Sequence, residues 1–133
     1  MRVIERAFRR TKVKRDMDLI REILLKVEAD PELQGSRFKV FDTSDFAGHS
    51  QEEITYHIDL LFENDFVKGI ETLDAPAPAI SRLTWQGHEF IADTSDPGIW
   101  ASVKERTKGL PDVAIAVIWE LAKAEVKKKL GLS

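Results

Sequence analysis

The sequence has no cysteine among its 133 residues. This absence excludes disulfide bonds, thiol catalysis and zinc sites with cysteine ligands. No apolar run approaches the roughly 20 residues that a membrane-spanning helix needs. The opening residues, MRVIERAFRR, also lack the apolar centre of a secretory signal. We therefore expect a cytoplasmic protein without a membrane partner.

Motifs that carry catalytic or metal chemistry are missing as well. There is no nucleophile elbow, phosphate-binding loop or glycine-rich cradle. His49, His57 and His88 form no i, i+4 pair on one helix, and partly buried structural histidines are the simpler interpretation. Paired carboxylates such as Glu52 and Glu53 stand where helix capping and solvation explain them. The prediction is a protein with no enzymatic activity, no catalytic residues, no metal site and no cofactor.

The composition, 43% hydrophobic and 32% charged, suits one folded domain with a sizeable core. Its charge is unevenly distributed. Residues 1–12 hold five basic and one acidic side chain, residues 13–93 hold eight basic and seventeen acidic ones, and residues 94–133 hold seven basic and five acidic ones. A nucleic acid would therefore have to be approached through the basic ends, because phosphate neutralisation supplies most non-specific affinity.

The first regular element predicted is a helix over residues 16–29, where apolar residues recur at helical spacing opposite charged ones. Asp30 and Pro31 end it, because the residue before a proline is disfavoured in helical geometry. Residues 38–41 alternate apolar and polar side chains and predict a short strand. Residues 42–49 are predicted to be a loop or one abbreviated helical turn.

A second helix is predicted after Ser50, which forms an S-x-x-E capping box with Glu53. Asn64 and Asp65 stand where such a helix usually ends in glycine, and both tolerate left-handed backbone. The apolar side chains expected on its buried face are Ile54, Ile58, Leu61 and Phe62.

A β-hairpin is predicted next, with strands over residues 66–73 and 80–83. The connecting residues 74–79, DAPAPA, contain two prolines that stiffen the tip and keep it out of the sheet. Thr84 can cap a following helix that runs to about residue 93. This hairpin is termed the wing below.

The C-terminal part is predicted to hold two helices, over residues 97–106 and 112–130, separated by breaks rich in glycine and proline. Apolar surface of the last helix that a small domain leaves uncovered would pair with a second copy or a partner, so a homodimer through this helix is considered. The aromatic side chains expected to close a small core and hold these helices on the body are Trp85, Phe90, Trp100 and Trp119.

Two motifs resemble bacterial winged-helix regulators. Residues 57–67, HIDLLFENDFV, resemble the pattern HLxxLxxxGLV of the metal-responsive repressors, except that the glycine is absent. Residues 83–87 resemble the LTxxG pattern where the returning strand of a wing meets the next helix. The resemblance implies a fold of class α+β, namely a winged helix-turn-helix with a two-stranded wing and additional C-terminal helices.

The chain also resembles, over about residues 14–131, a family of small bacterial and phage proteins with a domain of unknown function, similar to YjcQ-like winged-helix proteins. The matching segments are residues 14–21, 56–61 and 82–90, together with Trp100, Val103 and Lys104. The resemblance implies fold and origin but no activity or catalytic residues.

Members of that family typically begin near M-K-R-D-M, which reads Val13-Lys14-Arg15-Asp16-Met17 here. We hypothesise that residues 1–12 are an over-extended gene start, the alternative being a basic tail. The predicted organisation is a basic N-terminal extension (1–13), a winged-helix core (14–93) and a C-terminal helical extension (94–133) that packs on the core or dimerises.

The function predicted is a non-enzymatic winged-helix module of bacterial or prophage origin, acting as a transcription-regulator-like adaptor. The alternative is a protein-interaction module without direct DNA binding, because the polar face of the helix after Ser50 is acidic. Carboxylates near phosphates are unfavourable and offset base contacts worth ~1–3 kcal/mol each. Residues predicted to meet a partner are Glu52, Thr55, Tyr56, Asp59 and Glu63; those predicted to meet phosphates, if DNA binds, are Arg9, Arg10, Lys12, Lys14, Arg15, Lys68 and Arg82.

Overall fold

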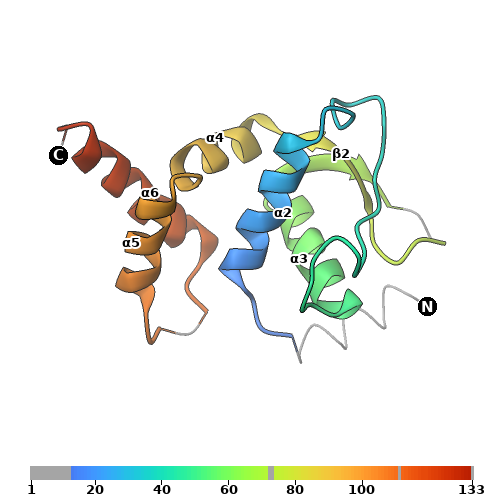
Figure 1. The fold of residues 1–133 in the computed structure, drawn as a ribbon, viewed down its shortest axis with the longest axis horizontal. Coiled ribbons are helices and arrows are strands. Elements are labelled where there is room, and N and C mark those ends of the chain that lie inside the picture. Colours follow the sequence, from blue (N-terminus) through green and yellow to red (C-terminus); the bar gives the residue numbers. More distant parts are fainter. Residues whose placement is uncertain (1–12, 72–73, 111, 133) are drawn as a thin grey trace. The chain divides into compact units, whose positions relative to one another are not determined.

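The computed structural model describes residues 13–71, 74–110 and 112–132 (Figure 1). These residues form a mixed α+β fold with five helices and one two-stranded antiparallel sheet, an arrangement consistent with a winged helix. Backbone contacts divide the chain into a first unit up to His88 and a second unit from Glu89 onward. The elements are α2 (Met17–Ala29), α3 (Gln51–Glu63), β1 (Val67–Ile70), β2 (Ala79–Leu83), α4 (Trp85–Thr94), α5 (Pro97–Thr107) and α6 (Ile115–Lys129).

Helix α2 begins and ends where the sequence predicts. Asp16 is its N-cap, and the Asp16 carboxylate accepts hydrogen bonds from the backbone N–H groups of Asp18 and Leu19 at 2.9 and 3.2 Å. Asp30 adopts extended backbone before Pro31 and stops the helix. The face that packs into the core consists of Leu19, Ile20, Ile23, Leu24 and Val27.

Helix α3 has both ends fixed by local motifs. At the start, Ser50 and Glu53 form the predicted capping box. At the end, Asp65 takes a φ of 58°, and the N–H groups of Asp65 and Phe66 donate to the carbonyls of Phe62 and Leu61 at 3.1 and 2.9 Å. This is a Schellman termination without glycine. The helix buries more than predicted, namely Ile54, Thr55, His57, Ile58, Leu60 and Leu61, whereas Phe62 is only half-buried.

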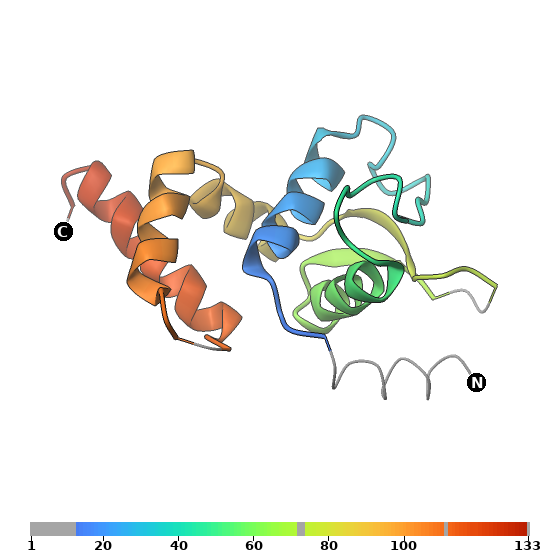
Figure 2. The ribbon, with the colours of Figure 1, turned by 60° about the horizontal axis from the view of Figure 1, so that its bottom comes forward.

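The predicted hairpin is present, with Val67 opposite Leu83 and Lys68 opposite Arg82. A register shift follows Lys68, and Gly69 is required there because a Cβ would stand 1.9 Å from the Ala79 carbonyl oxygen. The prediction of a strand over residues 38–41 is wrong in extent. Within this segment only Lys39 pairs, in an isolated β-bridge in which Lys39 and Ile80 exchange two backbone hydrogen bonds. Figures 1 and 2 show α2 beside α3 with this hairpin next to them.

The turn from β2 into α4 explains the LTxxG pattern. The Thr84 hydroxyl accepts from the Gly87 N–H at 3.0 Å and donates to the Asp65 carbonyl oxygen, so it joins the start of α4 to the end of α3. The Thr84 N–H donates to the Phe66 carbonyl at 3.0 Å. A Cβ at Gly87 would lie 2.1 Å from the same oxygen. Glycine is therefore needed because the first turn of α4 touches the chain where it enters β1.

In the second unit, the side chains of the α4 end, α5 and α6 pack together. The Trp119 indole donates to Asp93 at 2.7 Å and meets Phe90 edge to face, and Trp100 is buried as predicted. Lys129 pairs with Asp96 at 2.7 Å. The prediction for Trp85 is wrong: this side chain, in the first unit, is 77% exposed and holds nothing in a core.

Helix α6 also departs from its predicted bounds. It begins at Ile115 instead of Asp112, because Asp112 has a φ of 52°, outside helical geometry. Ala114 is the N-cap, without a capping hydrogen bond from its side chain. Its buried side chains are Ile115, Ile118 and Ala122, while Val117 and Leu130 are exposed. Among the described residues, no helix is long and apolar enough to cross a membrane.

Candidate interaction surfaces

Four of the five residues predicted to meet a partner share one stripe on α3. Glu52, Tyr56, Asp59 and Glu63 follow at spacings of four, three and four, which places them on one face of a helix. Glu52 and Glu63 are exposed, and Tyr56 and Asp59 are half-buried. These four residues are called the acidic stripe below. It carries three carboxylates and no basic side chain.

Thr55 does not belong to this surface, and its prediction as a partner contact is wrong. Its side chain is 4% exposed. The Thr55 hydroxyl donates to the carbonyl oxygen of Pro76 at 2.9 Å and accepts from the Gln51 amide at 3.1 Å. The loop before β2 therefore covers α3 at this point.

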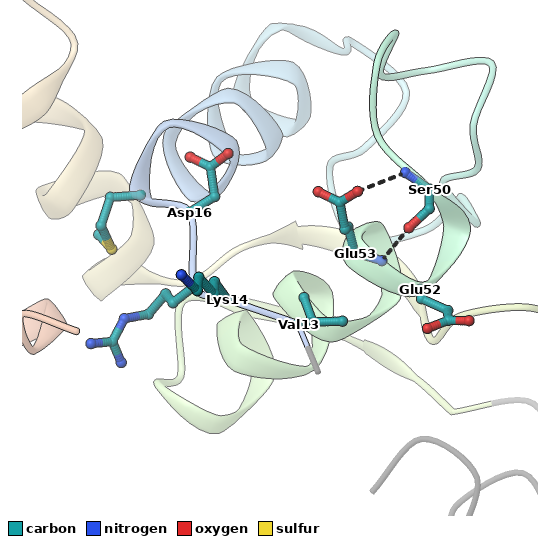
Figure 3. Close-up of a pocket in the computed structure, with 8 residues that line it drawn as sticks. Val13, Lys14, Asp16, Ser50, Glu52 and Glu53 are labelled. Atoms are coloured by element: carbon teal, nitrogen blue, oxygen red, sulfur yellow. Dashed lines mark hydrogen bonds between the residues drawn. The ribbon is translucent and has the colours of Figure 1, made fainter. Parts of the chain in front are cut away.

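A broad, open hollow of about 630 Å³ lies at the N-terminal end of α3. Lys14 and Arg15, two of the predicted phosphate contacts, line it together with Ser50, Glu52 and Glu53. Figure 3 shows Glu53 turned back to Ser50 while Glu52 points away from it. The Ser50 N–H, and after it the His49 ring, hold the pKa of Glu53 below its ordinary value. The hollow therefore contains negative charge, which opposes phosphate binding by Lys14 and Arg15.

His57 is a structural residue that joins α3 to the start of α2. It is fully buried, its Nε2 accepts from the Asp16 backbone N–H at 2.7 Å, and its Nδ1 lies 2.6 Å from the Glu53 carbonyl oxygen. These partners require a neutral ring with the proton on Nδ1. Burial is the main cause that lowers its pKa. The expectation of a structural histidine is correct for His57, whereas His88 is exposed.

The remaining predicted phosphate contacts fall in different places. Lys68 and Arg82 are cross-strand partners in the hairpin, and both are exposed. Lys68 lies 3.9 Å from Asp65, and one nitrogen of Arg82 donates to the Leu83 carbonyl at 2.9 Å. Arg9, Arg10 and Lys12 lie outside the described residues. The structure thus places two predicted cations opposite each other on the hairpin, on different elements from the acidic stripe of α3.

Groups of three or more histidine, cysteine or carboxylate side chains that could hold a metal are not found in the part of the chain that the structure describes. Three features expected from the sequence are present: the acidic face of α3, the capping box of Ser50 and Glu53, and the structural role of His57. The burial of Thr55 under Pro76 was missed, because nothing near Thr55 in the sequence indicates which loop will cover it.

Comparison with known proteins gives a family but no activity. The family model described as "Hypothetical protein (DUF2513)" matches residues 14–111. An uncharacterized protein of Haemophilus influenzae is 31% identical over 122 residues, which cover 90% of this chain and 100% of the relative. No solved structure gives a significant match. The chain belongs to the DUF2513 family.

Proposed function

We propose that this member of the DUF2513 family is a winged-helix adaptor without enzymatic activity that binds a protein partner through the acidic stripe of α3. The winged-helix assignment is supported by the order of α2, α3, the antiparallel hairpin and α4, and by the bridge from Lys39 to Ile80, where a third strand of such a sheet would stand. The resemblance to YjcQ-like proteins and to bacterial regulators supports the same assignment and a regulatory role.

The single observation that carries the proposal is the charge of the stripe. In winged-helix DNA readers, side chains of the recognition helix meet base edges and phosphates. The stripe offers Glu52, Asp59 and Glu63 instead. A carboxylate about 4 Å from a phosphate costs ~1 kcal/mol at the dielectric of water and ~4 kcal/mol near a protein surface. Three such terms sum to ~3 kcal/mol in water, which offsets one base contact of ~1–3 kcal/mol, and to ~12 kcal/mol near a protein surface, which exceeds two. This face therefore disfavours groove reading.

The same charges favour a cationic partner. A lysine- or arginine-rich segment would meet the stripe with complementary charge, which raises association rate and specificity. Tyr56 lies in the middle of the stripe, and a half-buried tyrosine is a typical anchor of a protein interface. The expected partner is therefore a protein that presents a basic helix or extended segment to α3.

Site-specific photocrosslinking in cells of the source organism tests this. A photoreactive amino acid replaces Tyr56, and the same replacement at Ala101, exposed on α5, is the matched control. The expected result is a polypeptide adduct at position 56 that maps to a Lys/Arg-rich segment and is lost when Glu52, Asp59 and Glu63 become Gln, Asn and Gln. Cross-linking to DNA, or an adduct unaffected by these changes, would contradict the proposal.

A second candidate function is backbone contact with duplex DNA through the wing. The observation that favours it is the cross-strand pair of Lys68 and Arg82. Two phosphate contacts give weak, salt-dependent and sequence-independent binding. Replacing both residues by glutamine should weaken duplex binding by the full chain and lower its salt dependence, whereas the changes in the acidic stripe should not weaken it.

A further inference from the structure

The first unit has a second surface built from different elements than the acidic stripe. A cleft of about 280 Å³ lies between the end of α2, the turn after it, β2 and the first turn of α4. Its floor consists of the apolar side chains of Val27, Leu33 and Leu83, each at most 5% exposed. Trp85 stands at its edge with 77% of its surface exposed. None of the described residues that line it belongs to α3.

The size and lining of this cleft suit one inserted side chain. Pockets for cofactors and drug-sized ligands span ~300–1,000 Å³, so this one stands just below that range. A buried apolar floor beside an exposed aromatic ring is typical of the anchor pockets at the centre of protein interfaces. An indole exposed to this degree gains by contact with an apolar group, because that contact removes its surface from water.

The polar rim indicates what flanks the inserted side chain. Arg82 uses one nitrogen on the Leu83 carbonyl, and its other donors have no partner among the residues that the structure describes. Lys68 does not line the cleft; it is exposed directly across the hairpin from Arg82, with its Nζ 3.9 Å from an Asp65 carboxylate oxygen. Glu28, on the α2 side of the rim, is exposed and would repel a carboxylate there. A carboxylate of a bound segment would therefore lie on the β2 side of the cleft, near Arg82, and away from Glu28 on the α2 side. This asymmetry favours one orientation of the segment.

We infer that this cleft binds an acidic peptide segment of a partner protein. One aromatic or aliphatic side chain enters between Trp85 and the apolar floor, and neighbouring carboxylates meet Arg82 and Lys68. The cleft and the acidic stripe share no residue and select opposite charges, so the inference stands independently of the proposed function. If both hold, the protein presents two docking surfaces of opposite preference, which suits an adaptor.

Titration of the full chain by NMR provides the test. The probe is a short synthetic peptide of Asp and Glu with one central Phe, and two matched peptides carry Ser in place of Phe or Lys in place of the acidic residues. The expected result is a saturable shift of the Trp85 indole N–H and Arg82 side-chain resonances with the first peptide alone. Trp85→Ala and Arg82→Gln should each weaken binding about tenfold or more, which corresponds to ~1.4 kcal/mol. Both residues are exposed, so both variants should keep the wild-type melting temperature.

Several outcomes would overturn the inference. Equal binding of the Ser peptide would mean that only general charge attraction acts and that the cleft is not used. Shifts confined to residues away from Trp85, or unchanged affinity in both variants, would place the peptide elsewhere. Binding of single-stranded oligonucleotide at Trp85 with no response to the peptide would assign the indole to base stacking instead. A Glu52→Gln change should leave peptide affinity unchanged, so failure here is distinguishable from failure of the α3 proposal.

Discussion

Helix α3 and the strands β1 and β2 follow each other in the chain, yet the charged side chains of the helix and those within the two strands have opposite sign. The acidic stripe holds Glu52, Asp59 and Glu63, whereas the hairpin places Lys68 opposite Arg82. Buried side chains, caps and two close-packed glycines build this arrangement, and none of them depends on the charge of the exposed face. The comparison shows that an architecture consistent with a winged helix does not determine whether the exposed face of α3 is positively or negatively charged.

The largest expected effect comes from breaking the junction between α4 and the hairpin. Gly87→Ala places a Cβ 2.1 Å from the Phe66 carbonyl oxygen, so the first turn of α4 must move. We expect a loss of about 3 kcal/mol in the free energy of unfolding, measured by urea denaturation. Gln86→Ala, at an exposed neighbouring position, should change it by under ~0.5 kcal/mol. A Gly87→Ala protein as stable as wild type would contradict the account of the LTxxG motif.

The next effect concerns the bond that joins α3 to α2. His57→Phe leaves the Asp16 N–H without its acceptor and should cost ~1–3 kcal/mol in unfolding free energy. Because burial lowers the pKa of His57, the stability that its neutral form contributes is present above its unfolded value of ~6.5 and is lost as pH falls through the lowered pKa. Urea denaturation across this pH range should show the loss in wild type. A His57→Phe protein with the same pH profile would rule out His57 as its source.

A smaller effect is expected where the wing covers α3. Thr55→Val keeps the shape of the side chain but removes the hydrogen bond to the Pro76 carbonyl at 2.9 Å. The expected loss is about 1 kcal/mol, with faster amide hydrogen exchange at Ala75 and Ala77. Thr43→Val, at an exposed position, serves as the control. Unchanged exchange in that loop would show that α3 does not hold it, and the face of α3 would then be more open than described.

The smallest effect on stability is expected beside the hairpin, at Trp85. Trp85→Ala should alter the unfolding free energy by less than ~0.5 kcal/mol, since the side chain is 77% exposed. It should also remove most of the tryptophan fluorescence that iodide can quench, because Trp100 is buried and Trp119 is bonded to Asp93. A destabilised Trp85→Ala protein would mean that the indole is packed and the cleft is closed.

Local signals in the sequence predicted the helix ends and the hairpin. The capping box of Ser50 and Glu53 and the left-handed Asp65 act within a few residues, so their consequences can be derived from neighbours alone. Apart from the start of α6, which the backbone of Asp112 decides, the errors involve contacts between distant segments. Thr55 is buried because Pro76 reaches it, and residues 38–41 reduce to one bridge because only Lys39 meets Ile80. Trp85 is exposed because apolar character alone does not determine which face a helix buries.

Glu52, Tyr56, Asp59 and Glu63 share one face of α3, as helical spacing requires, and their contact with a partner stays a prediction. What periodicity leaves open is the partner. The charges of Glu52, Asp59 and Glu63 favour a cationic protein segment. On the hairpin, two of the predicted phosphate contacts, Lys68 and Arg82, stand opposite each other.

The most direct test compares duplex binding by wild type and by the Glu52→Gln, Asp59→Asn, Glu63→Gln variant of the full chain, using fluorescence anisotropy at several salt concentrations. If the stripe opposes nucleic acid, neutralising it should raise duplex affinity, and the rise should be largest at the lowest salt concentration. An unchanged affinity would show that the stripe does not oppose duplex binding. A clear fall in affinity on neutralisation would instead show that these carboxylates contact bases, such as cytosine amino groups, and would contradict the account.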